Sequence, residues 1–298
     1  MNADQAVKMM RGPNQMHIIC IDVTNKCDLA CSNCTRLLEN QDGFWEMTPD
    51  QFRTALRSLK GYPGVIAMIG GNPCMHRQFP DLCSVFVEEI PHQIQRGLWT
   101  NNYFKHKTLV EQTFGTFNLN SHGMERAENN LADLHRKMVV ENGWMGWNYG
   151  GHSQHAPLLT AVKDLYEPDE MWQRITECDI NREWSATIIP NKGELKVYFC
   201  EVAASFDLAR GTDYGMPLEP GWWQKSIEHF ESQVKHFCPG CGVPAKHTPS
   251  LDKDEVDTYT DSNADIATKN IKRKVIYLKP ENYKSDTKKV TLYNETLR

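Results

Sequence analysis

The sequence has no apolar run approaching the roughly 18 residues that a membrane-spanning helix needs, and its mean hydropathy is −0.57. It also lacks an excess of basic residues, since the 298-residue chain has a net charge of −5, and we expect no general binding of nucleic acid. The opening segment, MNADQAVKMMRGPNQMH, lacks the apolar stretch typical of a signal peptide. We therefore expect a cytoplasmic protein whose partners include neither a membrane nor a nucleic acid.

Cysteine is the residue type that this chain has in unusual number, with ten in all. In a reducing compartment, grouped cysteines more often bind metals or act in catalysis than form disulfides. Three of them fall within eight residues, as Cys27-Asp-Leu-Ala-Cys31-Ser-Asn-Cys34, and two form Cys238-Pro-Gly-Cys241. The other five are dispersed, and we expect two of these, Cys20 and Cys83, to be buried core residues because their neighbours are apolar.

Short apolar runs alternate with helical patterns along the first 165 residues or so. Thr48-Pro49-Asp50-Gln51 is typical of a helix start, with Thr48 as the capping residue and Gln51 closing a capping box. Alternation of this kind predicts an α/β fold with parallel strands, either a barrel or a doubly wound sheet. The predicted strands are 17–23, 64–69, 96–100 and 116–120, and further helices are predicted at 80–90, 105–113 and 125–142.

The pattern changes after Pro168. Segments 185–190 and 194–200 flank Asn191-Lys192-Gly193 and predict a β-hairpin. Apolar residues from Trp223 to Phe237 then recur at helical spacing, so we predict one helix that ends at Cys238. The remaining stretch, 246–298, is polar and charged, with two short strands predicted at 275–278 and 290–293.

The first cysteine group can be read in two ways. Three thiolates on a loop that leaves a strand can bind three irons of a [4Fe–4S] cluster and leave the fourth iron open to another ligand. The alternative is a zinc site completed by a histidine or a distant cysteine. No histidine lies between Cys27 and Cys34, which favours the cluster.

Together with the sequence Gly70-Gly71-Asn72-Pro73 after the second predicted strand, this triplet resembles the radical S-adenosylmethionine (SAM) superfamily over most of the first 240 residues. The resemblance implies that Cys27, Cys31 and Cys34 hold a cluster whose open iron chelates SAM. It also implies that the Gly-Gly-Asn-Pro segment contacts the SAM amine, where the family usually has Gly-Gly-Glu-Pro. Asn72 keeps a carbonyl acceptor but loses the charge, and Asn33 replaces an aromatic residue common in the family.

Further SAM contacts are implied at the ends of the third and fourth predicted strands. Thr100 and Asn101 follow one strand, and Ser121 follows the other. Family members often bind the SAM ribose or carboxylate at these places. Ordinary polar residues at strand ends explain all three equally well.

The second cysteine group consists of Cys178, Cys200, Cys238 and Cys241. Four thiolates can complete the coordination of either a structural zinc or a second [4Fe–4S] cluster. Their order resembles the twitch subdomain of radical SAM dehydrogenases, where four cysteines hold an auxiliary cluster. The resemblance implies a partial (β/α)6 TIM-like barrel over 1–167, a small α+β twitch-like domain over 168–245, and a charged extension over 246–298.

The reaction that this resemblance implies is oxidation of an alcohol on a small polar substrate such as a sugar or aminocyclitol, with the auxiliary cluster accepting an electron. Such a reaction needs a general base, for which His152 and His155 are candidates, and a reductant such as flavodoxin or ferredoxin. If the Cys74 thiol instead donates a hydrogen atom, the reaction is an epimerisation; otherwise Cys74 is an inert small residue. Modification of a ribosomal peptide is a third reaction, and a zinc-binding scaffold is the non-enzymatic alternative.

Overall fold

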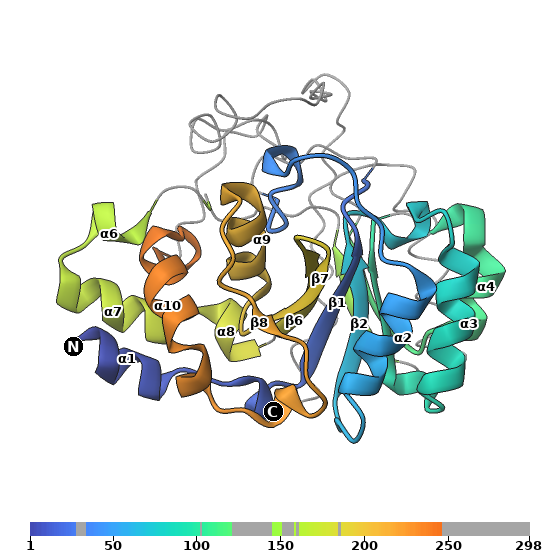
Figure 1. Cartoon of the computed structure of the whole chain (residues 1–298), viewed down its shortest axis with the longest axis horizontal. Helices are drawn as coiled ribbons and strands as arrows, with labels where there is room; N and C mark the ends of the chain where they lie inside the picture. Colours follow the sequence, from blue (N-terminus) through green and yellow to red (C-terminus); the bar gives the residue numbers. More distant parts are fainter. Residues whose placement is uncertain are drawn as a thin grey trace.

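The computed structural model describes residues 1–27, 34–101, 103–120, 145–150, 158, 161–183 and 186–245. The helix predicted at 125–142 and the strands predicted at 275–278 and 290–293 lie outside these residues. The fold is of the mixed α/β class, as the sequence predicts, with helices packed against a mostly parallel sheet (Figure 1).

The sheet has eight described strands in the order β5-β4-β3-β2-β1-β6-β7-β8. Neighbouring strands from β5 through β1 to β6 pair in parallel, whereas β6 pairs with β7, and β7 with β8, in antiparallel orientation. Because the first five strands are adjacent in chain order, the carboxyl ends of successive strands meet along one edge. The four strands predicted in the first half are confirmed as β1–β4. The bounds are β1 Ile18–Thr24, β2 Val65–Gly70, β3 Arg96–Thr100, β4 Thr116–Asn120, β5 Met145–Gly150, β6 Ala186–Asn191, β7 Glu194–Tyr198 and β8 Met216–Pro217.

The predicted hairpin is confirmed as β6–β7, but it extends the same sheet. Residues Ile19–Ile21 of β1 pair in register with Ala186–Ile188 of β6. β1 therefore lies between β2 and β6, two strands far apart in the sequence. The strands on the two sides of residue 168 thus form one continuous sheet. The domain boundary that the sequence predicts at this residue stays a prediction.

Three helices cover one face of the sheet, namely α2 (Pro49–Ser58), α3 (Phe79–Glu89) and α4 (Lys107–Thr113). The predicted capping box at the start of α2 is present: Thr48 Oγ1 accepts from Gln51 N at 3.2 Å, and Gln51 Oε1 accepts from Thr48 N at 2.9 Å. Phe52 of α2 meets Phe86 of α3 edge to face, with ring centroids 5.3 Å apart. Cys20 and Cys83 are buried, as predicted.

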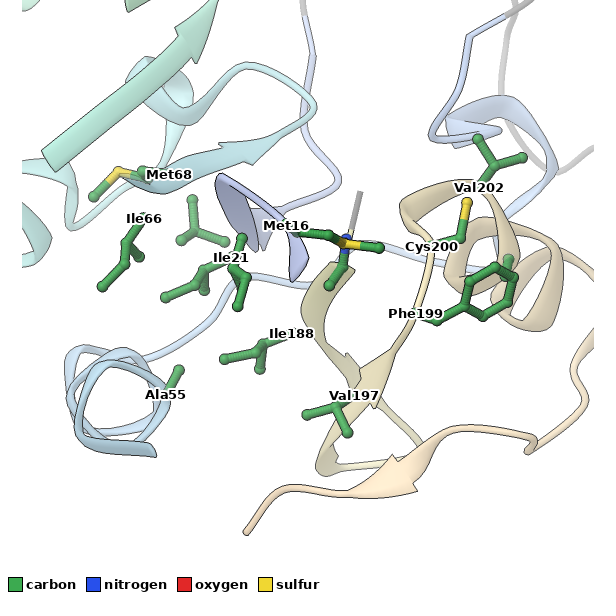
Figure 2. Packing of buried hydrophobic residues seen from close by; sticks show 14 of the residues in the cluster. Met16, Ile21, Ala55, Ile66, Met68, Ile188, Val197, Phe199, Cys200 and Val202 are labelled. Atoms are coloured by element: carbon green, nitrogen blue, oxygen red, sulfur yellow. The ribbon is translucent and has the colours of Figure 1, made fainter. Parts of the chain in front are cut away.

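The largest apolar core cluster continues from this helical layer to the second half of the chain. Figure 2 shows Ala55, Ile66 and Met68 at one side of the cluster and Phe199 and Cys200 at the other. The helices on that far side are α1 Ala3–Met9, α6 Val162–Leu165, α7 Pro168–Thr176, α8 Asp179–Glu183, α9 Glu201–Arg210 and α10 Glu231–Phe237. None of the described helices is long and apolar enough to cross a membrane.

The helix predicted to run from Trp223 to Phe237 is interrupted. Two 3-10 turns occupy Trp222–Gln224 and Ile227–Phe230, and only Glu231–Phe237 is α-helical. The break lies at Lys225 and Ser226, whose backbones are extended with ψ of 138° and 168°. The apolar spacing survives the break because a 3-10 turn also repeats close to every third residue. The prediction of one continuous helix is therefore wrong.

His76 ties the turn after β2 to the start of α2, and its ring is buried. Gln78 N donates to Nδ1 at 2.9 Å, so Nε2 carries the proton that is donated to Met47 O, also at 2.9 Å. A second ring proton would break the bond from Gln78. Burial lowers the pKa of His76 below its ordinary value, partly offset by Glu46.

The lowered pKa predicts a pH-dependent loss of stability. Below about pH 6.5 the unfolded chain binds a proton on His76 that the folded chain excludes, so the unfolding free energy falls with pH until the folded pKa is reached. The slope is at most about 1.4 kcal/mol per pH unit. We expect the unfolding temperature of wild type, relative to that of His76→Gln, to decrease between about pH 7.5 and about pH 5.5. A constant difference across that range would contradict the prediction.

Candidate functional site

Those residues of the predicted first site that the structure describes follow the carboxyl ends of three adjacent strands. β1 ends at Thr24, three residues before Cys27; β2 ends at Gly70; and β3 ends at Thr100. This edge is where α/β sheets commonly bind ligands. Cys31 and Ser121 lie outside the described residues, and so do His152 and His155.

The first cysteine loop leaves β1 and returns to it. On the returning side, Met47 N donates to Val23 O at 2.8 Å, and Asn25 N donates to Trp45 O at 3.3 Å. The Asn25 side chain closes the same junction, accepting from Trp45 N at 3.0 Å and donating to Gly43 O at 2.9 Å. The base of the loop is thus anchored on both sides. Cys27 and Cys34 are half-buried above it, and neither forms a disulfide.

The two glycines that end β2 pack directly against the residues leading to Cys27. Gly70 has a φ of +144°, and Gly71 N donates to Thr24 O at 2.8 Å. A Cβ atom on Gly71 would lie 2.2 Å from Lys26 O and 3.1 Å from the Cβ of Cys27. Only glycine permits this approach. The Gly-Gly segment therefore positions the chain's own cysteine loop; its contact with SAM stays a prediction.

The side-chain oxygen of Asn72, Oδ1, accepts hydrogen bonds from within the protein. This atom accepts from Cys74 N at 3.0 Å and from Thr100 Oγ1 at 2.8 Å, and all three residues are buried. Both lone pairs of this oxygen are then used within the protein. Pro73 begins the 3-10 turn that follows, and Asn101 is buried directly after β3.

Cys74 lies beneath this edge rather than on it. Its side chain belongs to the main apolar core cluster, and Thr100 Oγ1 is 3.8 Å from its sulfur. A hydrogen-atom donor must touch the substrate, which a residue exposed by only 6 % can do only if its surroundings open. The role of Cys74 as a donor stays a prediction.

The four cysteines of the second group line one pocket. Cys178 follows α7, Cys200 is the N-cap of α9, and Cys238 and Cys241 flank the turn after α10. The pocket has about 390 Å³ of space free of protein atoms, part of it open to solvent. Its remaining lining is apolar apart from Asn181 and includes three phenylalanines, Phe199, Phe206 and Phe237.

Backbone and side-chain contacts hold these cysteines in place. Gln233 of α10 accepts from Phe199 N at 3.2 Å and donates to Val197 O at 3.1 Å, which joins the Cys200 segment to the helix that ends at Cys238. Val162 N donates to Cys241 O at 3.3 Å. Three of the four thiols are buried, and Cys238 is half-buried.

Burial makes three thiols of the second group less acidic than ordinary cysteines. Burial, followed by the charge of Cys178, raises the pKa of the Cys200 thiol to about 12, while the N–H groups of Ala203 and Val202 act in the opposite direction. Burial likewise raises the pKa values of Cys238 and Cys241. Metal binding displaces such protons because the thiolate is the ligand. Among the described residues, no three His, Cys, Asp or Glu side chains converge on a single ion position.

Arg210 supplies positive charge near Cys241 of the second group. Its guanidinium lies 4.6 Å over the Phe206 ring, and its Nη2 is 3.2 Å from where a Cβ on Gly240 would be. Its charge acts to lower the pKa of Cys241. Sequence reasoning missed Arg210 because α9, the helix that carries it, was not predicted.

No family model matches the chain, and no curated protein was found to be similar to it. Among solved structures, the chain is similar to BtrN in complex with AdoMet and 2-DOIA. The two sequences are 17% identical, the match covers 79% of this chain and 98% of that one, and the TM-score is 0.49. This likeness concerns the course of the chain and assigns no residue, ligand or reaction.

Proposed function

We propose that the protein is a radical SAM enzyme. The observation that carries the proposal is the Cys27–Cys34 loop, anchored at both sides of its base on β1 and packed against Gly70-Gly71 at the carboxyl edge of the sheet. Three cysteines on such a loop fit a [4Fe–4S] cluster with one open iron. When bound, that cluster supplies the electron that cleaves SAM into methionine and a 5′-deoxyadenosyl radical.

The chain's own residues have three tasks in this proposal. Cys27, Cys31 and Cys34 hold the cluster. Gly71 fixes the loop that carries them, since its backbone lies against Lys26 and Cys27. Asn72 and Thr100 join the ends of β2 and β3 by a 2.8 Å hydrogen bond and so keep the floor of the SAM site rigid.

The reaction that we propose is oxidation of an alcohol to a ketone on a small polar substrate, such as a sugar or aminocyclitol. The carbinol carbon would give up one hydrogen atom, for which bound SAM would supply the radical acceptor. The hydroxyl proton passes to a base, for which His152 and His155 are the candidates. Cys178, Cys200, Cys238 and Cys241, which line one pocket, would hold an auxiliary [4Fe–4S] cluster, and such a cluster would accept the one remaining electron. A flavodoxin or ferredoxin would supply the electron for SAM cleavage.

Iron and sulfide content after anaerobic reconstitution tests the proposal. Wild type should bind about eight irons per chain, and the Cys27→Ala/Cys31→Ala/Cys34→Ala variant about four. Cys83→Ala is the matched control, because Cys83 is buried in α3 and lies in neither cysteine group. About four irons falling to none would remove the auxiliary cluster from the proposal. Absence of iron from wild type would contradict it and favour the zinc scaffold.

Solvent deuterium separates oxidation from epimerisation. Oxidation consumes one SAM per turnover and returns no hydrogen to the substrate. Epimerisation with Cys74 as donor would place solvent deuterium on one carbon, and Cys74→Ala would then stop turnover without stopping SAM cleavage. The burial of Cys74 favours oxidation, in which no deuterium enters the substrate.

A further inference from the structure

A buried group of three charged side chains connects the two cysteine groups. None of the three belongs to either group, but two of them are close in the chain to a cysteine of one or the other. Arg36 Nε is 2.6 Å from Asp22 Oδ1, and Arg36 Nη2 is 2.9 Å from Glu201 Oε2. The side chains are exposed by only 4 % for Arg36, 1 % for Asp22 and 7 % for Glu201. We call these three residues the Arg36 triad.

The positions of the triad in the chain are what make it informative. Arg36 is two residues after Cys34, at the end of the first cysteine loop. Glu201 directly follows Cys200 and is the first residue of α9. Asp22 lies within β1, the strand from which the first loop leaves. The Arg36 guanidinium thus contacts both Asp22 of β1 and Glu201, the residue next to Cys200 of the second group.

Other hydrogen bonds hold each member of the triad in place. Thr187 of β6 donates to Asp22 Oδ2 at 2.6 Å, and Gln41 Nε2 donates to Arg36 O at 2.8 Å. The Cys20 thiol is 3.7 Å from Glu201 Oε2. The guanidinium therefore has little freedom to move unless one of its two carboxylates moves too.

Stability alone is a weak explanation for such a group. Removing charges from water costs several kcal/mol per ion, and well-packed apolar residues in place of a buried ion pair are often as stable or more so. The best-attested use of buried ionic groups is to fix the relative position of segments. Here the segments so fixed are the two cysteine groups.

We propose that Arg36 is a positioning residue that couples the two cysteine sites, so that a group bound at the second site strengthens ligand binding at the first. A cluster on Cys200 restrains Glu201, Glu201 restrains Arg36, and Arg36 restrains the end of the loop that carries Cys34. Coupling between sites is reciprocal, so SAM at the first site should also tighten the second. The identity of the groups bound at the two sites rests on the proposed function. The contacts of the Arg36 triad are independent of that function.

The decisive experiment measures SAM affinity by equilibrium dialysis of anaerobically reconstituted protein in a double-mutant cycle. With Arg36 present, emptying the second site by Cys238→Ala/Cys241→Ala should weaken SAM binding by a factor on the order of 5 to 150, the usual range of coupling between sites. In an Arg36→Met background the same change should have less than about a 2-fold effect. An equal effect in both backgrounds would overturn the proposal.

Arg53→Met is the matched control. Arg53 also contacts two carboxylates, Glu88 at 2.8 Å and Glu89 at 2.7 Å, but on the surface between α2 and α3. Emptying the second site should weaken SAM binding as much in this background as in wild type. Glu201→Leu, which removes the carboxylate that Arg36 contacts but leaves Arg36 paired with Asp22, should behave like Arg36→Met and replaces it if that variant fails to fold.

A second measurement needs no bound cluster and separates failure of the coupling from failure of the proposed function. In protein as purified, Arg36→Met should raise the rate of alkylation by iodoacetamide at both Cys34 and Cys200, read by mass spectrometry, whereas Arg53→Met should raise neither. Unchanged rates at both cysteines would overturn the proposal even if iron content were as expected. If wild type binds no iron, raised rates at both cysteines would still support the connection.

Discussion

Gly71→Ala is expected to lose most of the iron of the first cysteine site and about tenfold or more of its SAM affinity. The added Cβ would lie 2.2 Å from Lys26 O, a backbone atom that cannot rotate away, and 3.1 Å from the Cβ of Cys27. Relief requires the first cysteine loop to shift or the hydrogen bond from Asn72 N to Lys26 O, 2.7 Å long, to break. Such overpacking costs about 1–3 kcal/mol, and 1.4 kcal/mol corresponds to a factor of ten in binding.

Gly240→Ala provides the matched control for this prediction, since it adds the same methyl group beside the other cysteine pair. Its nearest neighbour is Arg210 Nη2 at 3.2 Å, the far end of a flexible side chain that can move aside. We expect iron content and SAM affinity to stay within about twofold of wild type, in keeping with a surface substitution. If Gly71→Ala retained iron and SAM affinity as well as Gly240→Ala does, the close approach of β2 to the cysteine loop would have no role in the site.

Asp207→Ala is expected to lower the free energy of unfolding by at least about 3 kcal/mol. The carboxylate is fully buried and accepts from Tyr198 Oη at 2.7 Å, Tyr214 N at 2.8 Å, Gly215 N at 3.3 Å and the hydroxyl of Thr212. Its removal leaves several buried donors without an acceptor, each costing about 1–3 kcal/mol. Asp207 lies on α9, which begins after Cys200, so if the second group binds the proposed cluster, its iron content should fall as well.

Denaturant unfolding of wild type, Asp207→Ala and Asp213→Ala checks this expectation. Asp213 is a nearby carboxylate with 41 % side-chain exposure, and its interaction with Lys196 is 3.8 Å long. Loss of an exposed pair of this kind should cost no more than about 1 kcal/mol. Equal decreases in the free energy of unfolding of the two variants would show that the hydrogen bonds to Asp207 contribute little to stability.

Local sequence patterns were sufficient to predict the first half of the sheet and the edge where the first site lies. The strands β1 and β2 are short, largely apolar runs, and Thr48 marks the start of helix α2 between them. Parallel pairing of neighbours then places Cys27, Gly71 and Asn101 at one edge. This part of the site depends only on where each strand ends, which sequence reveals.

The contacts between distant segments could not be predicted in this way. Helix α9 was missed because eight of its ten residues are buried, including Glu201, Ser205 and Asp207, so it lacks the alternation of polar and apolar faces that signals a surface helix. The Arg36 triad joins residues more than 160 positions apart. One sequence signal did exist: Asp22 is a charged residue within an otherwise apolar strand, and a buried charge requires a partner.

The pairing of β6 with β1 also has a consequence for the order of events during synthesis. Glu201 follows Cys27 by 174 residues in the chain, so the ribosome adds it about 9 to 35 s later at ordinary elongation rates. Until β6 has been added, β1 can pair with β2 on one side only, and until residue 201 has been added Arg36 has no Glu201 to contact. The contact between Arg36 and Glu201 can therefore form only after translation has passed residue 201, whereas the hydrogen bonds at the base of the first cysteine loop need no residue beyond Gly71.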